Sequence, residues 1–228
     1  MTQSIRNLIG DRVLARDGGI GSVHDLYFDD ERWAVRYLVV DTGEWLPGKR
    51  VLISPASVEP GLSSGGNVRL GVAREQVQSA PPAESDRPVS RRYEIAHARH
   101  FGYPYYWAGP MLWGVGAYPV PLRADATLAG EAEAKPEEGD PHLRSGAEVI
   151  GYGIEARDGA IGEVEDFIVD DKSWAIRDIV VDTLKWWPGG HVRVHPEYVE
   201  RIDWNERKVH LRLTREQVKL AGAATPRR

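Results

Sequence analysis

The segment Asp158-Gly-Ala-Ile-Gly162 opens a pattern that occurs twice in this chain. Three further segments complete the pattern: Glu163-Val-Glu-Asp166, Val180-Val-Asp-Thr183 and Trp186-Trp-Pro-Gly189. An earlier copy contains the matching segments Asp17-Gly-Gly-Ile-Gly21, Val39-Val-Asp-Thr42 and Trp45-Leu-Pro-Gly48. Residues 9–77 align with residues 150–218 without a gap, and roughly 45% of the aligned positions are identical. The chain therefore contains a duplicated module.

The duplication predicts two domains of similar size in the 228 residues. We expect the first domain at residues 1–79, a linker at 80–145, the second domain at 146–221 and a short tail at 222–228. Each module reads as six short strands separated by turn residues and followed by a short helix, which is typical of a small barrel. The expected fold is therefore mainly β, with two β-barrels in tandem, each closed by a short C-terminal helix.

The sequence makes predictions about the first residues of three helices. Thr214-Arg-Glu-Gln217 has the spacing of a capping box, in which Thr accepts from a backbone amide and Gln reaches back. Ala73 stands at the position aligned with Thr214, so the closing helix of the first module is expected to be more frayed. Ser90 is expected to begin a further helix that reaches His100 in the linker.

The order of these motifs resembles that of the PRC-barrel family, which is named for the cytoplasmic domain of the photosynthetic reaction-centre H subunit. The resembling residues are D-G-x-I-G-x-V-x-D, then D-D-x-x-W-A-I-R, V-V-D-T, W-x-P-G and T-R-E-Q, within residues 8–79 and 149–220. The resemblance implies a barrel fold and a tendency to dock onto other proteins. It implies no catalytic residue, because the family shares no active site.

Composition excludes several classes of function. The formal net charge is −5, and Lys and Arg form no long run, so nucleic acid is not an expected partner. The absence of cysteine excludes disulfides and cysteine-based metal sites. No apolar stretch approaches the roughly 18 residues that a membrane span needs. We therefore expect a soluble bacterial protein that lies in the cytoplasm or at the periphery of a membrane.

Motifs that could support catalysis or metal binding are weak. Gly61-Leu-Ser-Ser-Gly65 matches G-x-S-x-G, but a nucleophile elbow requires a turn from strand to helix, and this segment lies in a loop. His191 and His195 lie four residues apart on an extended segment, which separates them by about 13 Å. His97 and His100 lie closer together, but the first module has neither pair. We expect no catalytic residue, no cofactor and no metal.

The hairpin at the centre of each module has a predictable register. A loop that is symmetric about Asp30 and Glu31 would place Leu26, Phe28, Trp33 and Val35 on one apolar face, and the second module has the matching set Phe167, Val169, Trp174 and Ile176. The same register places Asp25 opposite Arg36, and Asp166 opposite Arg177. Both pairs are predicted to be structural ion pairs.

The linker contains aromatic residues at a density that is unusual for a flexible tether. Tyr105, Tyr106, Trp107 and Trp113 are the candidate partner patch, because exposed Tyr and Trp are common in interfaces. The same rings could instead cover the barrels within the chain. We expect residues 101–118 to be ordered and packed against the barrels, in contrast to the acidic tract at 125–140.

The interpretation favoured by these observations is a non-enzymatic adaptor that binds another protein of unknown identity. We expect the two barrels to associate around an approximate two-fold axis as an intramolecular pseudo-dimer, because a duplicated chain most simply preserves the contact of an ancestral dimer. One alternative is a peripheral accessory of a membrane or photosynthetic electron-transport complex. A second alternative is a module that binds a small molecule or a metal.

Overall fold

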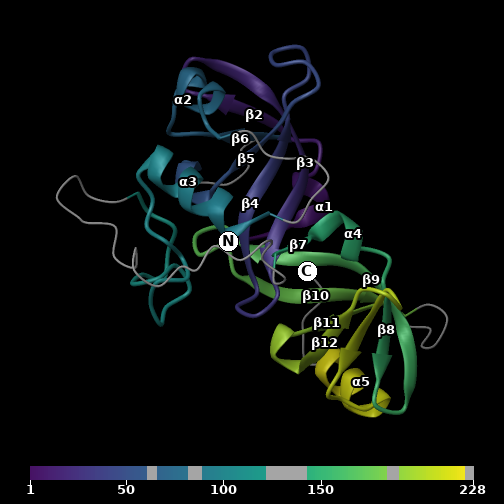
Figure 1. Ribbon diagram of the computed structural model, residues 1–228. Helices are drawn as coiled ribbons and strands as arrows, with labels where there is room; N and C mark the ends of the chain where they lie inside the picture. The colour runs from purple at the N-terminus through teal and green to yellow at the C-terminus, as the bar shows by residue number, and fades with distance from the viewer. Residues whose placement is uncertain (61–65, 82–88, 122–142, 184–189, 224–228) are drawn as a thin grey trace.

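The computed structural model describes residues 1–60, 66–81, 89–121, 143–183 and 190–223 and contains two sheets (Figure 1). The first sheet has the order β5-β4-β3-β2-β6, with β7 paired to β3. Its strands are β2 (Arg12–Ala15), β3 (Gly18–Asp29), β4 (Ala34–Asp41), β5 (Arg50–Ile53), β6 (Asn67–Arg69) and β7 (Leu143–Ser145). Each sheet is built mainly from one repeat.

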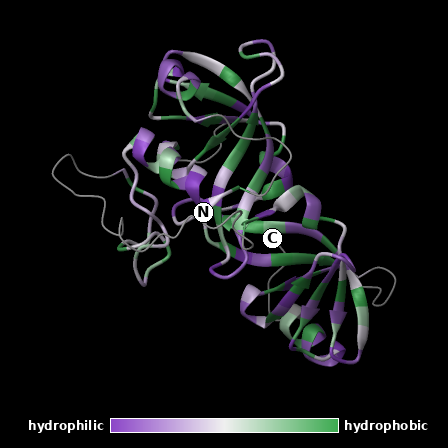
Figure 2. Cartoon of the chain, in the orientation of Figure 1, coloured by the Kyte–Doolittle hydropathy of each residue, from purple (hydrophilic) through white to green (hydrophobic). Residues whose placement is uncertain are grey.

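The second sheet has the order β11-β10-β9-β8-β13-β12, with β1 paired to β9. Its strands are β1 (Thr2–Ser4), β8 (Gly153–Ala156), β9 (Gly159–Asp170), β10 (Ile176–Asp182), β11 (His191–Val194), β12 (Val199–Asp203) and β13 (Lys208–Leu211). Hydrophobic residues concentrate on the strands of both sheets (Figure 2) and form a core that runs through the two repeats. The predicted mainly β fold is confirmed.

Helices connect and cover these strands. They are α1 (Ile5–Leu8), α2 (Arg74–Gln78), α3 (Arg91–Phe101), α4 (Gly146–Val149) and α5 (Arg215–Ala223). Short 3₁₀ turns lie at Pro55–Ser57 and Pro196–Tyr198. After the first of these turns, Val58 makes an isolated antiparallel bridge to Leu70.

The predicted helix caps are confirmed. Thr214 Oγ1 accepts a hydrogen bond from the amide of Gln217, whose side-chain oxygen accepts one from the amide of Thr214. Ala73 provides no side-chain cap, and α2 has five residues whereas α5 has nine. Ser90 Oγ accepts from the amide of Tyr93 at the start of α3.

Each repeat completes the sheet of the other repeat. Strand β1, at the start of the chain, pairs antiparallel with β9, and β7, just before the second repeat, pairs antiparallel with β3. These three-residue strands lie in segments that the sequence assigned to the first domain and to the end of the linker. The exchange ties the N-terminal end of each repeat to the other sheet.

A buried aspartate anchors each exchanged segment. The carboxylate of Asp25 accepts hydrogen bonds from Ser145 Oγ and from the amide of Ala147, at the start of α4. At the aligned position, the carboxylate of Asp166 accepts from Ser4 Oγ and from the amide of Arg6. Burial raises the pKa of Asp25, and these hydrogen bonds oppose that rise. The two aspartates therefore fasten helix starts of the opposite repeat.

Equivalent residues of the two repeats also meet directly. Ala34 forms an antiparallel bridge with Ala175, the residue aligned with it. The amide of Val35 donates to the carbonyl of Trp174 at 2.9 Å, and the amide of Ile176 donates to the carbonyl of Trp33 at 2.7 Å. The contacts between the two central hairpins are therefore matched, residue for aligned residue.

The predicted hairpin register is wrong, although the predicted apolar faces are confirmed as part of the core. Asp29 pairs with Ala34 and Asp25 with Val39, because the loop consists of residues 30–33 and includes Trp33, which adopts a left-handed φ of 52°. Phe28 pairs with Val35 and Tyr27 with Tyr37, which leaves Arg36 as the extra residue of a bulge. Arg36 therefore does not face Asp25.

The second hairpin departs from the prediction in the same way. Ile176 pairs with Val169 and Asp178 with Ile168, so Arg177 is the extra residue at the aligned bulge. Asp166 lies opposite Val180. The predicted pairs Asp25–Arg36 and Asp166–Arg177 are therefore replaced by other contacts, and the nearest carboxylates to the arginines are those of Asp29 and Asp170.

Candidate functional site

Residues 89–121, hereafter called the insert, cover the outer face of the first sheet. Tyr37, Val39 and Leu52 of that face form a second hydrophobic cluster with Leu143 of β7, and Tyr93 of α3 packs against it. Every residue from 34 to 40 is buried, so β4 is covered on both faces. The insert thus buries an apolar surface that a single sheet would leave in water.

The second repeat has a polar surface at the matching place. Asp178 stands where the first repeat has Tyr37, and Arg193 stands where it has Leu52. The Arg193 guanidinium lies 3.7 Å from the Asp178 carboxylate, and both side chains are partly exposed. The insert is therefore specific to the first repeat, and the replacement of Tyr by Asp between the copies is the sequence signal for this difference.

Arg36 is the centre of the contact between the insert and the first sheet. Its side chain is fully buried, and Nη2 lies 2.8 Å from Asp29 Oδ2. Its Nη1 donates to the carbonyl of Leu112 at 2.7 Å. The guanidinium also lies 4.0 Å from the ring centroid of Tyr106 and 4.8 Å from that of Trp113. The bulge that displaces Arg36 from its predicted partner aims it into the insert.

A buried carboxylate, Glu94 of α3, organises a second polar contact. Its Oε1 accepts hydrogen bonds from the hydroxyls of Tyr37 and Tyr106 at 3.2 and 2.9 Å. Its Oε2 lies 2.9 Å from Nη1 of Arg91. Burial raises the pKa of Tyr37 well above its ordinary value, and the nearby Glu94 charge adds to the rise. The tyrosine therefore stays a neutral donor that links β4 to the insert.

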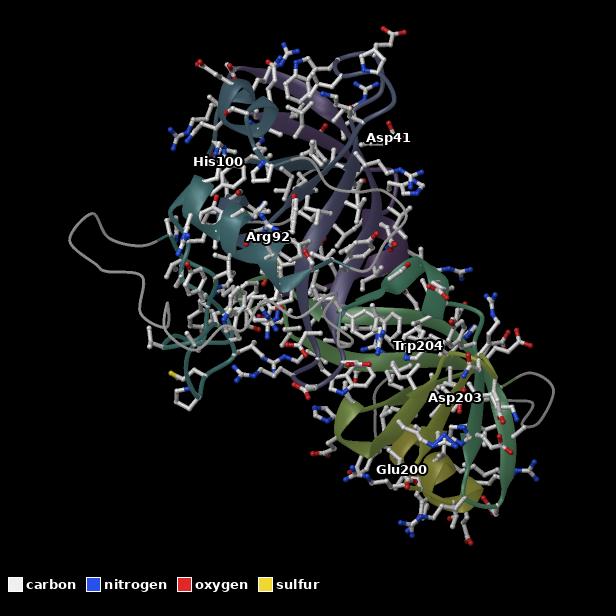
Figure 3. The ribbon with its side chains drawn as sticks, viewed as in Figure 1. Asp41, Arg92, His100, Glu200, Asp203 and Trp204 are labelled. Carbon is white, nitrogen blue, oxygen red and sulfur yellow. The ribbon has the colours of Figure 1, made fainter. Side chains whose placement is uncertain are left out.

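His97 connects α3 to the edge strand β5. Its Nε2 lies 2.9 Å from the carbonyl of Leu52, so the neutral ring donates there. Burial lowers the pKa of His97 to about 4, although this hydrogen bond opposes the shift. His97 is not positioned to bind a metal together with His100. His100 lies near the end of α3 (Figure 3), and its Nε2 contacts the carbonyl of Gln76 in α2.

Acidification is expected to destabilise the packing of α3 through His97. The folded-state pKa of about 4 lies below the pKa of histidine in the unfolded chain. Neutral His97 therefore makes its full contribution to the free energy of unfolding above about pH 6.5, and this contribution is lost as the pH falls toward 4. Between pH 7.5 and pH 5, the free energy of unfolding should fall by about 2 kcal/mol from this group. Urea denaturation at both pH values measures the difference.

The matched variants are His97→Gln, which can still donate to Leu52 but does not titrate, and His195→Gln on the surface. The first should lose most of the extra pH dependence, whereas the second should retain it. An unchanged pH dependence in His97→Gln would show that other groups cause it.

The insert also contacts both central hairpins. Arg32, in the loop of the first hairpin, donates from Nη1 to the carbonyl of Met111 at 2.6 Å and from Nη2 to that of Gly109 at 3.1 Å. The indole of Trp113 donates to the carbonyl of Ser173 at 2.7 Å. Ser173 is aligned with Arg32, so the insert spans the junction between the repeats.

The aromatic residues proposed as a partner patch face inward. Tyr105, Tyr106 and Trp113 are 2%, 7% and 5% exposed, and Trp107 is partly buried. Their rings pack against one another, and those of Tyr106 and Trp107 also pack against Arg36 and Arg91. They therefore do not form an exposed patch, and the alternative that they cover the first repeat agrees with their burial.

Other side chains of the insert remain in contact with water. Six large hydrophobic side chains are exposed in the described parts of the chain, and four of them lie between residues 111 and 120. These four are Met111, Val115, Tyr118 and Val120, which are 46%, 73%, 55% and 55% exposed. These side chains were not predictable from ring size, because burial depends on which residues of the insert meet the sheet.

A groove lies where the insert meets the end of the first repeat. It has a volume of about 350 Å³, and the repeat provides one wall with Arg16, Val58 and Glu59. Phe101, Tyr103 and Pro121 of the insert belong to its lining. Pro121 directly follows Val120, so the exposed segment ends beside this groove.

Other motifs from the sequence do not form a site among the described residues. His191 Nδ1 lies 2.5 Å from a carboxylate oxygen of Glu165, whereas His195 caps the turn at Pro196–Tyr198. The G-x-S-x-G segment at 61–65, the second Trp-Trp-Pro-Gly segment at 186–189 and the acidic tract at 125–140 lie outside the described residues. No helix in the described ranges combines the length and the hydrophobicity that crossing a membrane requires.

The comparisons with known sequences and families concern the first repeat. No curated protein sequence is significantly similar to this chain. Among protein families, the PRC-barrel domain matches at residues 2–66, from β1 to the residue before β6. This range includes the central hairpin, Asp25 and Arg36. The match supports assignment of the first repeat to the PRC-barrel domain family.

Proposed function

We propose that this protein is a non-enzymatic adaptor that binds another protein through the insert. The observation that carries this proposal is the exposure of Met111, Val115, Tyr118 and Val120 on a segment that is otherwise packed against the first sheet. Clustered exposed apolar side chains are unfavourable in water and commonly mark a surface that a partner covers.

The packing of the insert supports a binding role. Arg32 and Arg36 hold its backbone carbonyls, and the Trp113 indole fastens it to the second repeat. A segment held in this way loses little conformational entropy when a partner binds, which favours affinity. The PRC-barrel match and the high identity between the repeats suggest two modules of one family, so we propose that both belong to it.

The expected partner contributes apolar side chains. The groove beside the insert adds aromatic and proline surface together with one basic and one acidic side chain, Arg16 and Glu59. An extended segment of a partner protein fits this mixture better than a charged polymer. The absence of a long basic run agrees with a protein partner rather than nucleic acid.

Quantitative affinity purification from the native organism tests the proposal. The double variant Val115→Asp/Tyr118→Asp should reduce recovery of the specific partner at least tenfold, since it places charge in the apolar contact. Leu220→Asp is the matched control, because Leu220 is 68% exposed on α5, away from the insert. This control should retain the partner. The unmodified chain, the double variant and the control should have the same melting temperature.

Equal recovery with both variants, or recovery that never exceeds background, would contradict the role of the insert. Fractionation of the same lysate distinguishes the alternatives for the location of the partner. Recovery from the membrane fraction would favour the peripheral accessory of a membrane complex.

A further inference from the structure

The hairpin of β12 and β13 carries a group of polar side chains on the second repeat. Arg201 pairs with His210, and Asp203 pairs with Lys208, across the two strands. Glu206 lies in the turn between the strands. Figure 3 shows Asp203 and Trp204 on this hairpin, which is remote from the insert.

Three of these side chains bring metal-ligating atoms together. One ligand atom from each of Asp203, Glu206 and His210 lies within 4.8 Å of the other two. In addition, Nε2 of His210 is buried and has no hydrogen-bond partner within the described ranges of the chain. A buried ring nitrogen without a partner is unfavourable, and a bound cation is one means of satisfying such an atom.

We propose that Asp203, Glu206 and His210 bind a divalent transition-metal ion of the zinc type. Two carboxylates and one imidazole form a mixed oxygen and nitrogen donor set, which suits Zn²⁺ or Co²⁺ better than Mg²⁺ or Ca²⁺. Three protein ligands leave positions for water, in agreement with the partial exposure of the group. This site is independent of the adaptor role proposed for the insert.

The charges around the group are compatible with this proposal. The amide of Glu206 donates to Asp203 Oδ1 at 3.0 Å, which helps to fix the position of that carboxylate. Arg201 lies 3.4 Å from Asp203 and Lys208 lies 3.3 Å from Glu206. Lys208 also lies 3.2 Å from Glu155, so it keeps an ion pair when Glu206 turns to a metal.

The first repeat provides an internal comparison. Leu62, Gly65 and Arg69 stand at the positions aligned with Asp203, Glu206 and His210. None of these three has a side chain suited to bind a metal cation. The sequence pattern of the repeat persists without the three ligands, so the repeated fold does not require them. Only the second repeat has this group, so the chain should bind one metal ion.

Isothermal titration of the full chain with zinc chloride at neutral pH tests the proposal. Saturable binding of one equivalent is expected, and His210→Gln should weaken its affinity at least tenfold. His195→Gln is the matched control, since His195 is another histidine of the second repeat with a nearby carboxylate, Glu197. It should bind zinc like the unmodified chain, and magnesium should not compete.

A second variant separates loss of the ligands from loss of the fold. Asp203→Asn/Glu206→Gln retains the size of both side chains and should also lose zinc binding, with an unchanged circular dichroism spectrum. The absence of saturable zinc binding by the unmodified chain would overturn the proposal. Equal weakening by His210→Gln and His195→Gln would also overturn it, because it would indicate nonspecific surface binding.

Discussion

Arg36→Ala is expected to lower the free energy of unfolding by about 3–5 kcal/mol, whereas Arg177→Ala should change it by about 1 kcal/mol or less. The two arginines occupy aligned bulges, yet the Arg36 side chain is fully buried and the Arg177 side chain is 52% exposed. Removing Arg36 leaves Asp29 without its buried cation, and it also removes the contacts with Tyr106, Trp113 and the carbonyl of Leu112.

Urea denaturation monitored by circular dichroism measures both changes. Arg36→Ala should also increase cleavage by chymotrypsin within residues 101–118, because the guanidinium holds the insert. Equal effects of the two substitutions would contradict the assignment of Arg36 to the centre of the insert contact. That outcome would instead favour equivalent roles in the two repeats, as the sequence alone predicts.

Gly162→Ala is expected to destabilise the second repeat by about 3 kcal/mol or more. A Cβ atom at this position would lie 1.9 Å from the carbonyl oxygen of Asp182, and φ is +152°, which side chains rarely adopt. Gly21 has the same restriction, with 1.9 Å to the carbonyl oxygen of Asp41 and a φ of +146°. The close approach of two backbone segments explains why both repeats have glycine here.

Gly19→Ala is the matched control for this prediction. A Cβ at Gly19 would meet only the Leu14 side chain at 3.8 Å, and the second repeat already has Ala160 at the aligned position. The change should be within about 0.5 kcal/mol of the original stability. If Gly162→Ala unfolds at the same urea concentration as Gly19→Ala, the backbone segments at Gly162 and Asp182 separate readily, and the prediction is wrong.

The sequence was sufficient to predict the repeated, mainly β architecture. Turn residues, alternating apolar residues and the T-R-E-Q caps are local signals, and each acts within a few residues of the chain. The core faces of the hairpins were also predictable, because next to the loop Phe28 pairs with Val35 instead of Trp33, and a change of two residues keeps a side chain on its original face.

The partners of the charged residues were not predictable in the same way. The left-handed conformations of Trp33 and Trp174 and the bulges at Arg36 and Arg177 change which residues lie opposite one another. Neither residue type has a strong preference for these conformations, so the sequence contained no local signal for them. The true partners of Asp25 and Asp166 come from segments more than 100 residues away.

The candidate binding surface was only partly predictable. The aromatic density of the insert correctly indicated that it packs on the first repeat, but not which side chains remain exposed. Comparing Tyr37 with Asp178, and Leu52 with Arg193, would have located the covered sheet face. The proposed metal site at His210 was not predictable, because its carboxylate neighbours lie on the opposite strand and in the turn, at spacings that match no common metal motif.

The exchange of β1 and β7 has a consequence for the order in which the chain can fold during synthesis. When the first repeat leaves the ribosome, β7 and the residues that bind Asp25 have not yet been made, since they begin at Leu143. Strand β1 must meanwhile remain available for β9, which ends at Asp170. Neither sheet can therefore be completed before most of the chain has been translated, and its longest-range contacts should form last.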